Sequence, residues 1–279
     1  MSINSTRVGS LKLVNPAKIK RFGTLYVAES RIRSLWKWRI SILSGSLLSP
    51  FFYLTSLGVG VGTLINARVG NAGVDGVSYV KFIAPALIAQ VAMNDFMTES
   101  TFPVLHGFKW EKVFFAMNAT TLNGRQIALG TYLAAATKTL VTTSIYYGVL
   151  SLFGAVHFWG DFLMILAVVY AAGCFAAIMM GAAATPENDD LFLNIMGRLL
   201  IMPLFLFSGT FYPLHSMPTI LEYVGYVSPL WHSVELARWI AYGHSIQGNI
   251  LAIHFLYLAV MFVAGIWYSA KRFEYRLTK

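Results

Sequence analysis

The sequence contains, at residues 162–184, the run FLMILAVVYAAGCFAAIMMGAAA, which carries no charged side chain. A helix needs roughly 20 apolar residues to cross about 30 Å of hydrocarbon. Other apolar runs of comparable length lie on either side of it, at residues 40–65, 79–97, 130–156, 191–211 and 250–270. The pattern predicts an all-α integral membrane protein whose six transmembrane helices occupy residues 40–270.

The composition agrees with this fold class. Of 279 residues, 57% are hydrophobic and only 12% are charged, whereas soluble domains carry about 25% charged residues. The single cysteine, Cys174, excludes a disulfide framework and a cysteine-based metal site. The chain is basic, but its cations flank the apolar runs, so we expect no nucleic-acid partner.

The basic residues also predict the orientation. Cytoplasmic segments of membrane proteins are enriched in Lys and Arg, and both ends of this chain are basic. The cations before the first run are Arg7, Lys12, Lys18, Lys20, Arg21, Arg31, Arg33, Lys37 and Arg39, and those after the last are Lys271, Arg272, Arg276 and Lys279. We therefore expect both termini in the cytoplasm, with tails at residues 1–21 and 271–279.

Residues 22–39, just before the first apolar run, are typical of an amphipathic helix in the membrane interface. Apolar and aromatic side chains recur there at helical spacing among the cations, namely Phe22, Leu25, Tyr26, Ile32, Leu35 and Trp36. Such a helix places aromatic rings at headgroup depth and its cations toward anionic lipid.

Two connections are longer than simple turns. The expected cytoplasmic one covers residues 98–129, and the expected external one covers residues 212–249. The external connection is half apolar and interrupted by prolines, so we expect short helices at residues 220–227 and 231–242 that enter the outer leaflet without crossing it. Additional spans are the alternative, but neither piece reaches a spanning length without a proline or a charge.

Motifs indicate no catalytic residue and no metal or cofactor bound by this chain. No Gly-Lys pair occurs, so the phosphate loop of a nucleotide-binding chain is missing. Three histidines of the external connection, His215, His232 and His244, are too widely spaced to predict a zinc site. Ser208 lacks the upstream glycine of a nucleophile elbow.

A few ionisable side chains fall within the expected spans. Asp95 and Glu99 share one face at the cytoplasmic end of the second run, and Lys138 lies about two turns into the third. An unpaired charge at that depth costs a few kcal/mol. Lys138 therefore either pairs with Asp95 or extends its ammonium to the interface. The scarcity of intramembrane carboxylates also weakens the alternative of a proton-coupled transporter.

Three groups of residues resemble a known family. They are FIAPAL at residues 82–87 with EST at 99–101, TTL at 120–122 with QIALG at 126–130, and LFSGTFYP at 206–213 with SPLWH at 228–232 and VELAR at 234–238. With the order of the elements, they make most of the chain resemble the type-2 ABC exporter permeases, above all the NodJ-like lipooligosaccharide exporters and the daunorubicin-type exporter permeases. Thr121 departs from the pattern, because relatives usually have proline there.

The resemblance implies partners and site roles. A separate ATPase subunit would bind ATP and Mg and receive a coupling helix over residues 120–127, including Thr120, Thr121, Leu122, Arg125, Gln126 and Ile127. The exit would be gated by Phe211, Tyr212, Pro213, Trp231, His232 and Glu235. A second permease, identical or related, would complete a path through the bacterial inner membrane, in contact with membrane lipid.

The implied function is that of a permease subunit exporting a lipid-linked or glycan-bearing amphiphile. Two alternatives remain open at this point. One is a hydrophobic drug or antibiotic exporter of the same type, and the other is a membrane-embedded enzyme that modifies lipids.

Overall fold

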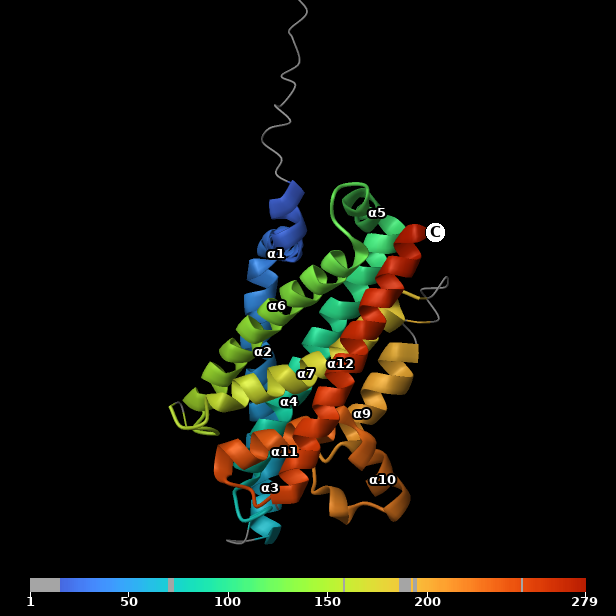
Figure 1. The fold of residues 1–279 in the computed structure, drawn as a ribbon. Coiled ribbons are helices and arrows are strands. Elements are labelled where there is room, and N and C mark those ends of the chain that lie inside the picture. The colour runs from blue at the N-terminus through green and yellow to red at the C-terminus, as the bar shows by residue number, and fades with distance from the viewer. Residues whose placement is uncertain (1–15, 70–72, 158, 186–191, 193–194, 247) are drawn as a thin grey trace, which may run out of the picture.

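The computed structural model describes residues 16–69, 73–157, 159–185, 192, 195–246 and 248–279. The regular secondary structure of this part of the chain is helical, and it contains no strand beyond an isolated bridge between Val74 and Val77. The all-α prediction is confirmed. The α-helices, in chain order (Figure 1), are α1 (Pro16–Trp36), α2 (Arg39–Tyr53), α3 (Gly62–Val69), α4 (Tyr79–Leu105), α5 (Val113–Asn118), α6 (Gly124–Leu152), α7 (Leu163–Ala183), α9 (Met202–Phe207), α10 (Thr219–Val227), α11 (Pro229–Tyr242) and α12 (Gly248–Thr278).

Short segments of other helix types extend several of these elements. Three are π-helical, namely η2 (Leu54–Val61), η4 (His106–Trp110) and η5 (Ile195–Ile201), and η6 (Leu214–Ser216) is a 3₁₀ turn. Because η2 joins α2 to α3, the first apolar run is helical from end to end.

Four of the described helices are long and apolar enough to cross a membrane: Arg39–Ile65, Tyr79–Trp110, Leu163–Ala183 and Gly248–Thr278. They coincide with the first, second, fourth and sixth predicted spans and support a multi-pass membrane protein. The third run lies in α6, which is long enough but rich in threonine. The fifth run is described as a helix only over η5 and α9, and much of its start lies outside the described residues. The count of six spans therefore stays a prediction.

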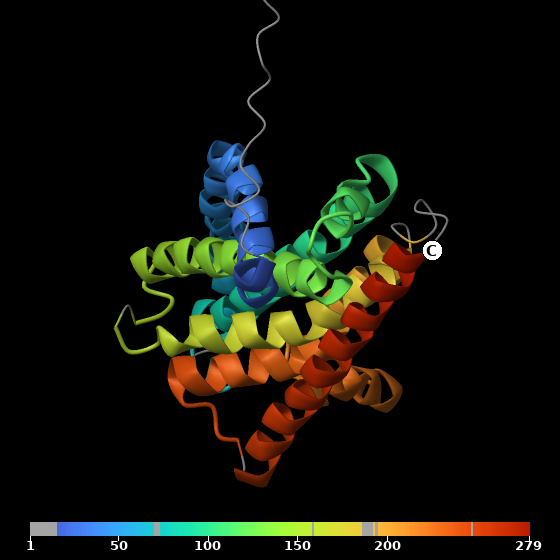
Figure 2. The ribbon, with the colours of Figure 1, turned by 45° about the horizontal axis from the view of Figure 1, so that its top comes forward.

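The core of the bundle forms around α7, which packs against α4, α11 and α12 (Figure 2). Small residues make this packing possible, because they let helix backbones approach closely. A Cβ atom at Gly265 of α12 would lie 2.8 Å from the backbone nitrogen of Ile178 in α7. One at Gly173 of α7 would lie 2.9 Å from the ring of Phe96 in α4.

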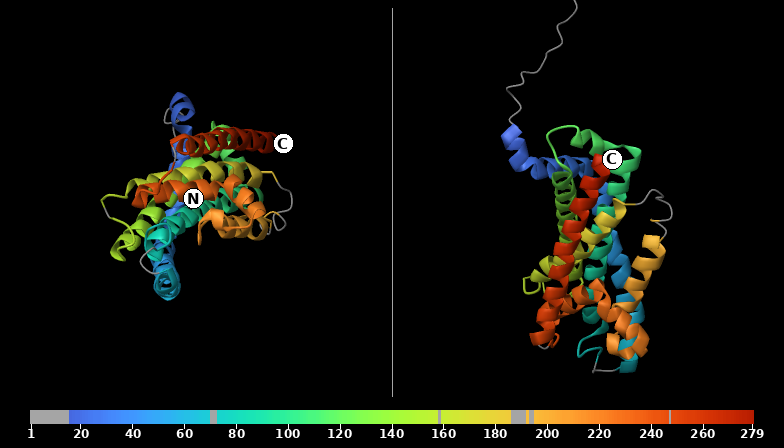
Figure 3. Two further views of the ribbon diagram at one scale, coloured as in Figure 1. Left: turned by 90° about the horizontal axis from the view of Figure 1, so that it is seen from below. Right: turned by 45° about the vertical axis from the view of Figure 1, so that its right-hand side comes forward.

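At the end of the bundle that carries the C-terminus, two helices extend beyond the boundaries expected from the sequence. Helix α4 and η4 continue to Trp110 and α6 begins at Gly124, so the connection covers residues 111–123 instead of 98–129. Asp95 and Glu99 do not end α4, because a charged pair on one face leaves the backbone hydrogen bonds of a helix intact. Helix α1 begins at Pro16, whereas the expected helix began at residue 22. A proline is favourable in the first turn of a helix. Helix α1 lies across this end of the bundle, at a steep angle to α2 (Figure 3).

The opposite end of the bundle is built from the connection between the last two predicted spans. Its expected short helices are present as α10 and α11. Between them, Ser228 Oγ accepts a hydrogen bond from the Leu230 N–H at 3.2 Å, and Pro229 opens α11. Gly243, with φ of 69°, ends α11 in the left-handed region.

Candidate functional site

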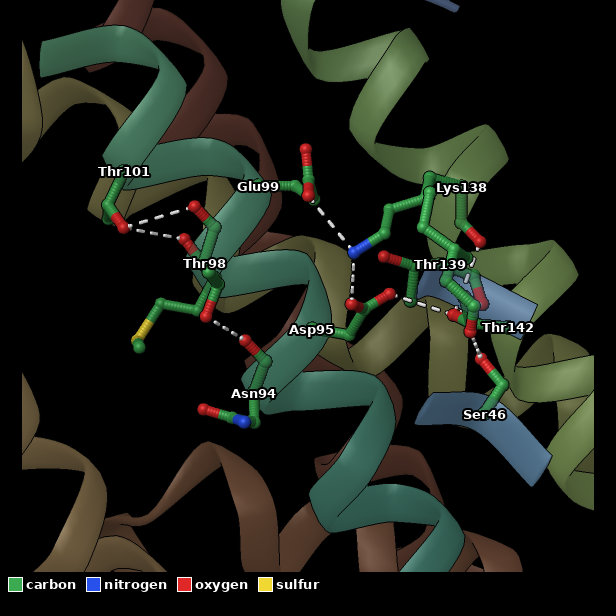
Figure 4. A network of polar contacts seen from close by, with 11 residues as sticks. Ser46, Asn94, Asp95, Thr98, Glu99, Thr101, Lys138, Thr139 and Thr142 are labelled. Atoms are coloured by element: carbon green, nitrogen blue, oxygen red, sulfur yellow. Dashed lines mark hydrogen bonds and ion pairs between the residues drawn. The ribbon is translucent and has the colours of Figure 1, made fainter. Parts of the chain in front are cut away.

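An ion cluster joins α4 to α6 inside the predicted membrane region. Lys138 Nζ lies 2.5 Å from Asp95 Oδ1 and 3.0 Å from Glu99 Oε1. The Thr142 hydroxyl donates a hydrogen bond of 2.8 Å to Asp95 Oδ2 (Figure 4). The structure thus brings together the two residues that sequence analysis offered as a pair, and Glu99 completes the cluster. The Lys138 ammonium is held between helices and does not extend to the interface.

The cluster is largely removed from solvent. The exposed fractions of the side chains are 14% for Lys138, 19% for Asp95 and 16% for Glu99. One ammonium faces two carboxylates, so the cluster carries a formal charge of −1. Charges buried this far are strongly coupled to their partners. The arrangement locks the relative position of the second and third predicted spans.

A cavity of about 120 Å³ lies at the opposite end, between the loop before α4 and the connection formed by η6, α10 and α11. Its lining combines aromatic, acidic and basic side chains. Three predicted gate residues line it, namely Pro213, Trp231 and Glu235, whereas the other predicted gate residues do not. Phe211 packs on Phe205 with ring centroids 4.9 Å apart. Tyr212 is exposed.

Arg238 is the central cation of this end, and only 2% of its surface is exposed. Its Nη2 donates a hydrogen bond of 2.8 Å to the carbonyl of Gly209, and its Nη1 lies 3.3 Å from Glu235 Oε1. Its guanidinium stands 3.9 Å from the ring centroid of Phe82. The side chain therefore connects α11 to α4 and to the loop after α9 that contains Gly209. In the sequence Arg238 stood out only as the last residue of the VELAR group at residues 234–238, although its apolar neighbours were a signal of burial.

His244 links two loops across the same cavity. Its Nε2 lies 3.2 Å from Glu235 Oε2, and its Nδ1 lies 2.7 Å from Asp75 Oδ2. The hydrogen bond with Glu235 raises the pKa of His244 above its usual value, against the opposing effect of burial, and Asp75 adds to the rise. Asp75 escaped sequence analysis because it comes from a loop more than 160 residues away.

His232, a predicted gate residue, is instead buried in a contact between α11 and α12. Its Nδ1 lies 2.6 Å from Nδ1 of His254, and the ring of Tyr257 stacks on it at 4.1 Å. Within the described ranges, no group of three or more His, Cys, Asp or Glu side chains could hold a metal ion. The arrangement is a packed contact between two helices.

Residues 120–127, the expected coupling helix, do not form a single helix. Thr120 and Thr121 form a turn, and Asn123 caps α6: its side chain accepts from the Gln126 N–H at 2.9 Å, while the Gln126 side chain accepts from the Asn123 N–H at 3.1 Å. This capping box starts a new helix at residue 124 and separates it from the preceding turn. The separate short helix of the connection is α5.

The predicted coupling residues divide by exposure. Ile127 is fully buried, and Leu122 and Gln126 are partly buried. Gln126 Nε2 donates a hydrogen bond of 2.8 Å to the carbonyl of Lys20 in α1. Thr120, Thr121 and Arg125 are exposed, and Arg125 Nε lies 2.6 Å from Glu274 Oε1 near the end of α12.

Comparison with known proteins matches this sequence to a family. The family model of the ABC-2 type transporter matches residues 25–242, from within α1 to the end of α11. The chain is 29% identical to nodulation protein J of Neorhizobium galegae over 239 residues, which is 85% of this chain and 87% of that protein. It is 30% identical to nodulation protein J of Rhizobium leguminosarum bv. viciae over 239 residues, 84% of this chain and 89% of that protein. The chain therefore belongs to the ABC-2 type transporter family, as a membrane transport subunit whose ATPase activity lies in a separate subunit.

Proposed function

We propose that this chain is the permease of an ATP-driven exporter that moves a lipid-linked or glycan-bearing amphiphile out of the cell. The observation that carries the cargo class is the similarity to nodulation protein J over 84–85% of the chain, because the NodJ-like branch implies lipooligosaccharide export. The cavity at the α10–α11 end supports it, since its aromatic and charged lining suits a molecule with a sugar part.

We assign the ATPase contact to the end of the bundle that carries α5 and the C-terminus. Thr120, Thr121 and Arg125 are exposed there and accessible to a partner. Their turn is tied to α12 through Glu274 and to α1 through Gln126. A displacement of this turn by the ATPase would therefore move α1 and α12, to which the turn is bonded.

Transport requires two permeases that enclose the path, either identical or related, and an ATPase pair that changes their arrangement. ATP binding can shift the permease only by binding one arrangement more tightly than the other. At the far end, Pro213, Trp231 and Glu235 would line the exit, and Phe211, Tyr212 and His232 would support it. The inner membrane is the expected location, with both termini cytoplasmic.

The test is reconstitution of the chain with its ATPase subunit in proteoliposomes. A lipooligosaccharide should stimulate ATP hydrolysis and become accessible on the exit side. The double change Thr120→Arg and Thr121→Arg should abolish stimulation, because it places two cations in the contact. Thr219→Arg, at a threonine that is also exposed but lies at the opposite end, is the control. Failure of the ATPase to associate, or full coupling in the double variant, would refute the proposal.

The same assay separates the cargo classes. Stimulation by hydrophobic drugs and not by a lipooligosaccharide would favour the drug exporter of the same family. Stimulation by the lipooligosaccharide alone supports the cargo proposed here.

A further inference from the structure

A second pocket lies apart from the outer cavity and borders the ion cluster through Lys138. It has a volume of about 280 Å³ and opens between α1, α2 and α6. Its wall is almost wholly apolar and includes Leu35 and Trp36 of α1, Leu43 of α2 and Val141 of α6. An open apolar wall of this size marks a surface that another molecule covers.

The depth of the pocket points to lipid. Two of its lining residues, Trp36 and Arg39, lie at the turn between α1 and α2, where the first spanning helix begins at Arg39. Trp36 and Trp38 flank this turn, with 68% and 69% of their surfaces exposed, and Ile40 is 75% exposed. Exposed tryptophans at the end of a span mark the level of lipid headgroups. The pocket thus has lining residues at headgroup level and others on α6.

The charge at the mouth is positive and available. Arg39 lines the pocket and is exposed. Its Nη1 makes a hydrogen bond of 3.4 Å to the Trp36 carbonyl, and its guanidinium stands 5.7 Å from the Trp36 ring. In the described part of the chain, no carboxylate forms an ion pair with Arg39 within 4.0 Å. Lys37, in the same turn, adds a second exposed cation.

The other cation of the lining does not compete for an anion. Lys138 borders the pocket, but its ammonium is held by Asp95 and Glu99. It therefore contributes its methylene stem to the apolar wall. The result is a pocket with a hydrocarbon interior and a cationic mouth.

We propose that this pocket binds one acyl chain of an anionic phospholipid from the inner leaflet, with the lipid phosphate on Arg39. The chain replaces the missing apolar contacts of the wall, and the guanidinium meets the phosphate as a planar donor. This site is separate from the cargo path of the proposed exporter. Its occupant bridges the interfacial helix α1 to α2 and α6.

Photolabelling of the purified full-length chain tests the site. The probe is phosphatidylglycerol with a diazirine near the end of one acyl chain, and mass spectrometry maps the labelled peptides. Labelling is expected at the wall residues Ile42, Leu43, Thr137 and Val141. Val141→Trp should fill the pocket and reduce this labelling at least fivefold. Leu140→Trp, on the same helix, 38% exposed and outside the pocket wall, should leave it unchanged.

A second arm tests the headgroup without altering the packed interior. Phosphatidylcholine with the same diazirine chain measures the preference for the anionic lipid. Arg39→Gln should reduce that preference about fivefold, which is the effect of one cation at a membrane surface. Arg33→Gln removes an equal charge from the exposed face of α1, outside the pocket, and should keep the preference.

Each contrary outcome overturns a defined part of the proposal. Equal labelling by the two lipids, or an unchanged preference in Arg39→Gln, refutes the anionic headgroup. Undiminished labelling in a folded Val141→Trp variant refutes the pocket. If a neutral lipooligosaccharide displaces the probe and excess phosphatidylglycerol does not, the pocket holds cargo and the phospholipid proposal is wrong.

Discussion

Replacing Lys138 by methionine should lower the free energy of unfolding by about 3–5 kcal/mol, the cost of removing one partner from a buried ion pair. Lys138 makes two charged contacts, of 2.5 and 3.0 Å, and each is worth about 1.5–3 kcal/mol. Because 14–19% of each of the three side chains is exposed to solvent, we expect the combined loss to be smaller than the maximum for two fully buried contacts. The variant also leaves Asp95 and Glu99 one helical turn apart with like charge, which is itself unfavourable.

Asp95→Asn provides the internal comparison. It should cost about 1–2 kcal/mol, because Lys138 keeps Glu99 as a partner and Thr142 can still donate to the side-chain oxygen. The triple variant Lys138→Met, Asp95→Asn and Glu99→Gln removes every charge of the cluster. It should recover most of the stability lost in Lys138→Met, because no unpaired charge remains in the membrane.

The assay is equilibrium unfolding in mixed micelles of a mild detergent and dodecyl sulfate, followed by circular dichroism. Wild-type stability in Lys138→Met would show that the ion contacts contribute nothing measurable. A triple variant as unstable as Lys138→Met would show that lost packing of the lysine stem, and not unpaired charge, accounts for the effect. Either result would refute the reasoning.

Three further predictions concern helix packing, helix capping and pH. Gly265→Ala should destabilise the α7–α12 contact by about 1–3 kcal/mol, because the new Cβ meets backbone 2.8 Å away; Gly148→Ala, where no atom lies within 4 Å of the new Cβ, should be neutral or stabilising by up to about 1 kcal/mol in the same unfolding assay, and an equal loss in both variants would contradict this. Asn123→Ala should cost about 1 kcal/mol and increase hydrogen exchange in the first turn of α6, whereas Asn123→Ser should retain most of the cap; unchanged exchange in the alanine variant would contradict the capping role. The raised pKa of His244 means that its contacts with Glu235 contribute fully below pH of about 6.5 and are lost as pH rises through the raised value; His244→Gln should remove this part of the pH dependence of unfolding, and an unchanged pH profile would rule it out.

Much of the secondary structure could be predicted from the sequence. The apolar runs at residues 40–65, 79–97, 162–184 and 250–270 are spanning-length helices, and the prolines at 218 and 229 precede or open α10 and α11 as expected. The helix boundaries at the end of the bundle that carries the C-terminus were less predictable. Polarity in the sequence suggested that α4 ended near residue 97, whereas its charges are satisfied within the bundle and the helix continues to residue 105.

The candidate sites divide in the same way. Asp95 and Lys138 could be selected because ionisable residues are rare in apolar runs. The position of Arg238 could not be derived, because its main acceptor is the carbonyl of Gly209, 29 residues away in a broken segment without regular spacing. His254 lay inside an apolar run without a partner in sequence, and its contact with His232 depends on how α11 crosses α12.

The sequence by itself determined that the chain is a bundle of membrane helices, because backbone groups in lipid must be satisfied within their own segment and a long apolar run leaves no other structure. It also determined which segments contain few charged residues, where an unpaired charge in the membrane is energetically unfavourable. Only the tertiary structure decided which charges meet: Glu99 joins Asp95 on Lys138, and Asp75 joins Glu235 on His244. Those contacts arise from helix crossings and loop positions, which depend on side-chain packing between segments far apart in the chain and leave no periodic pattern in the sequence.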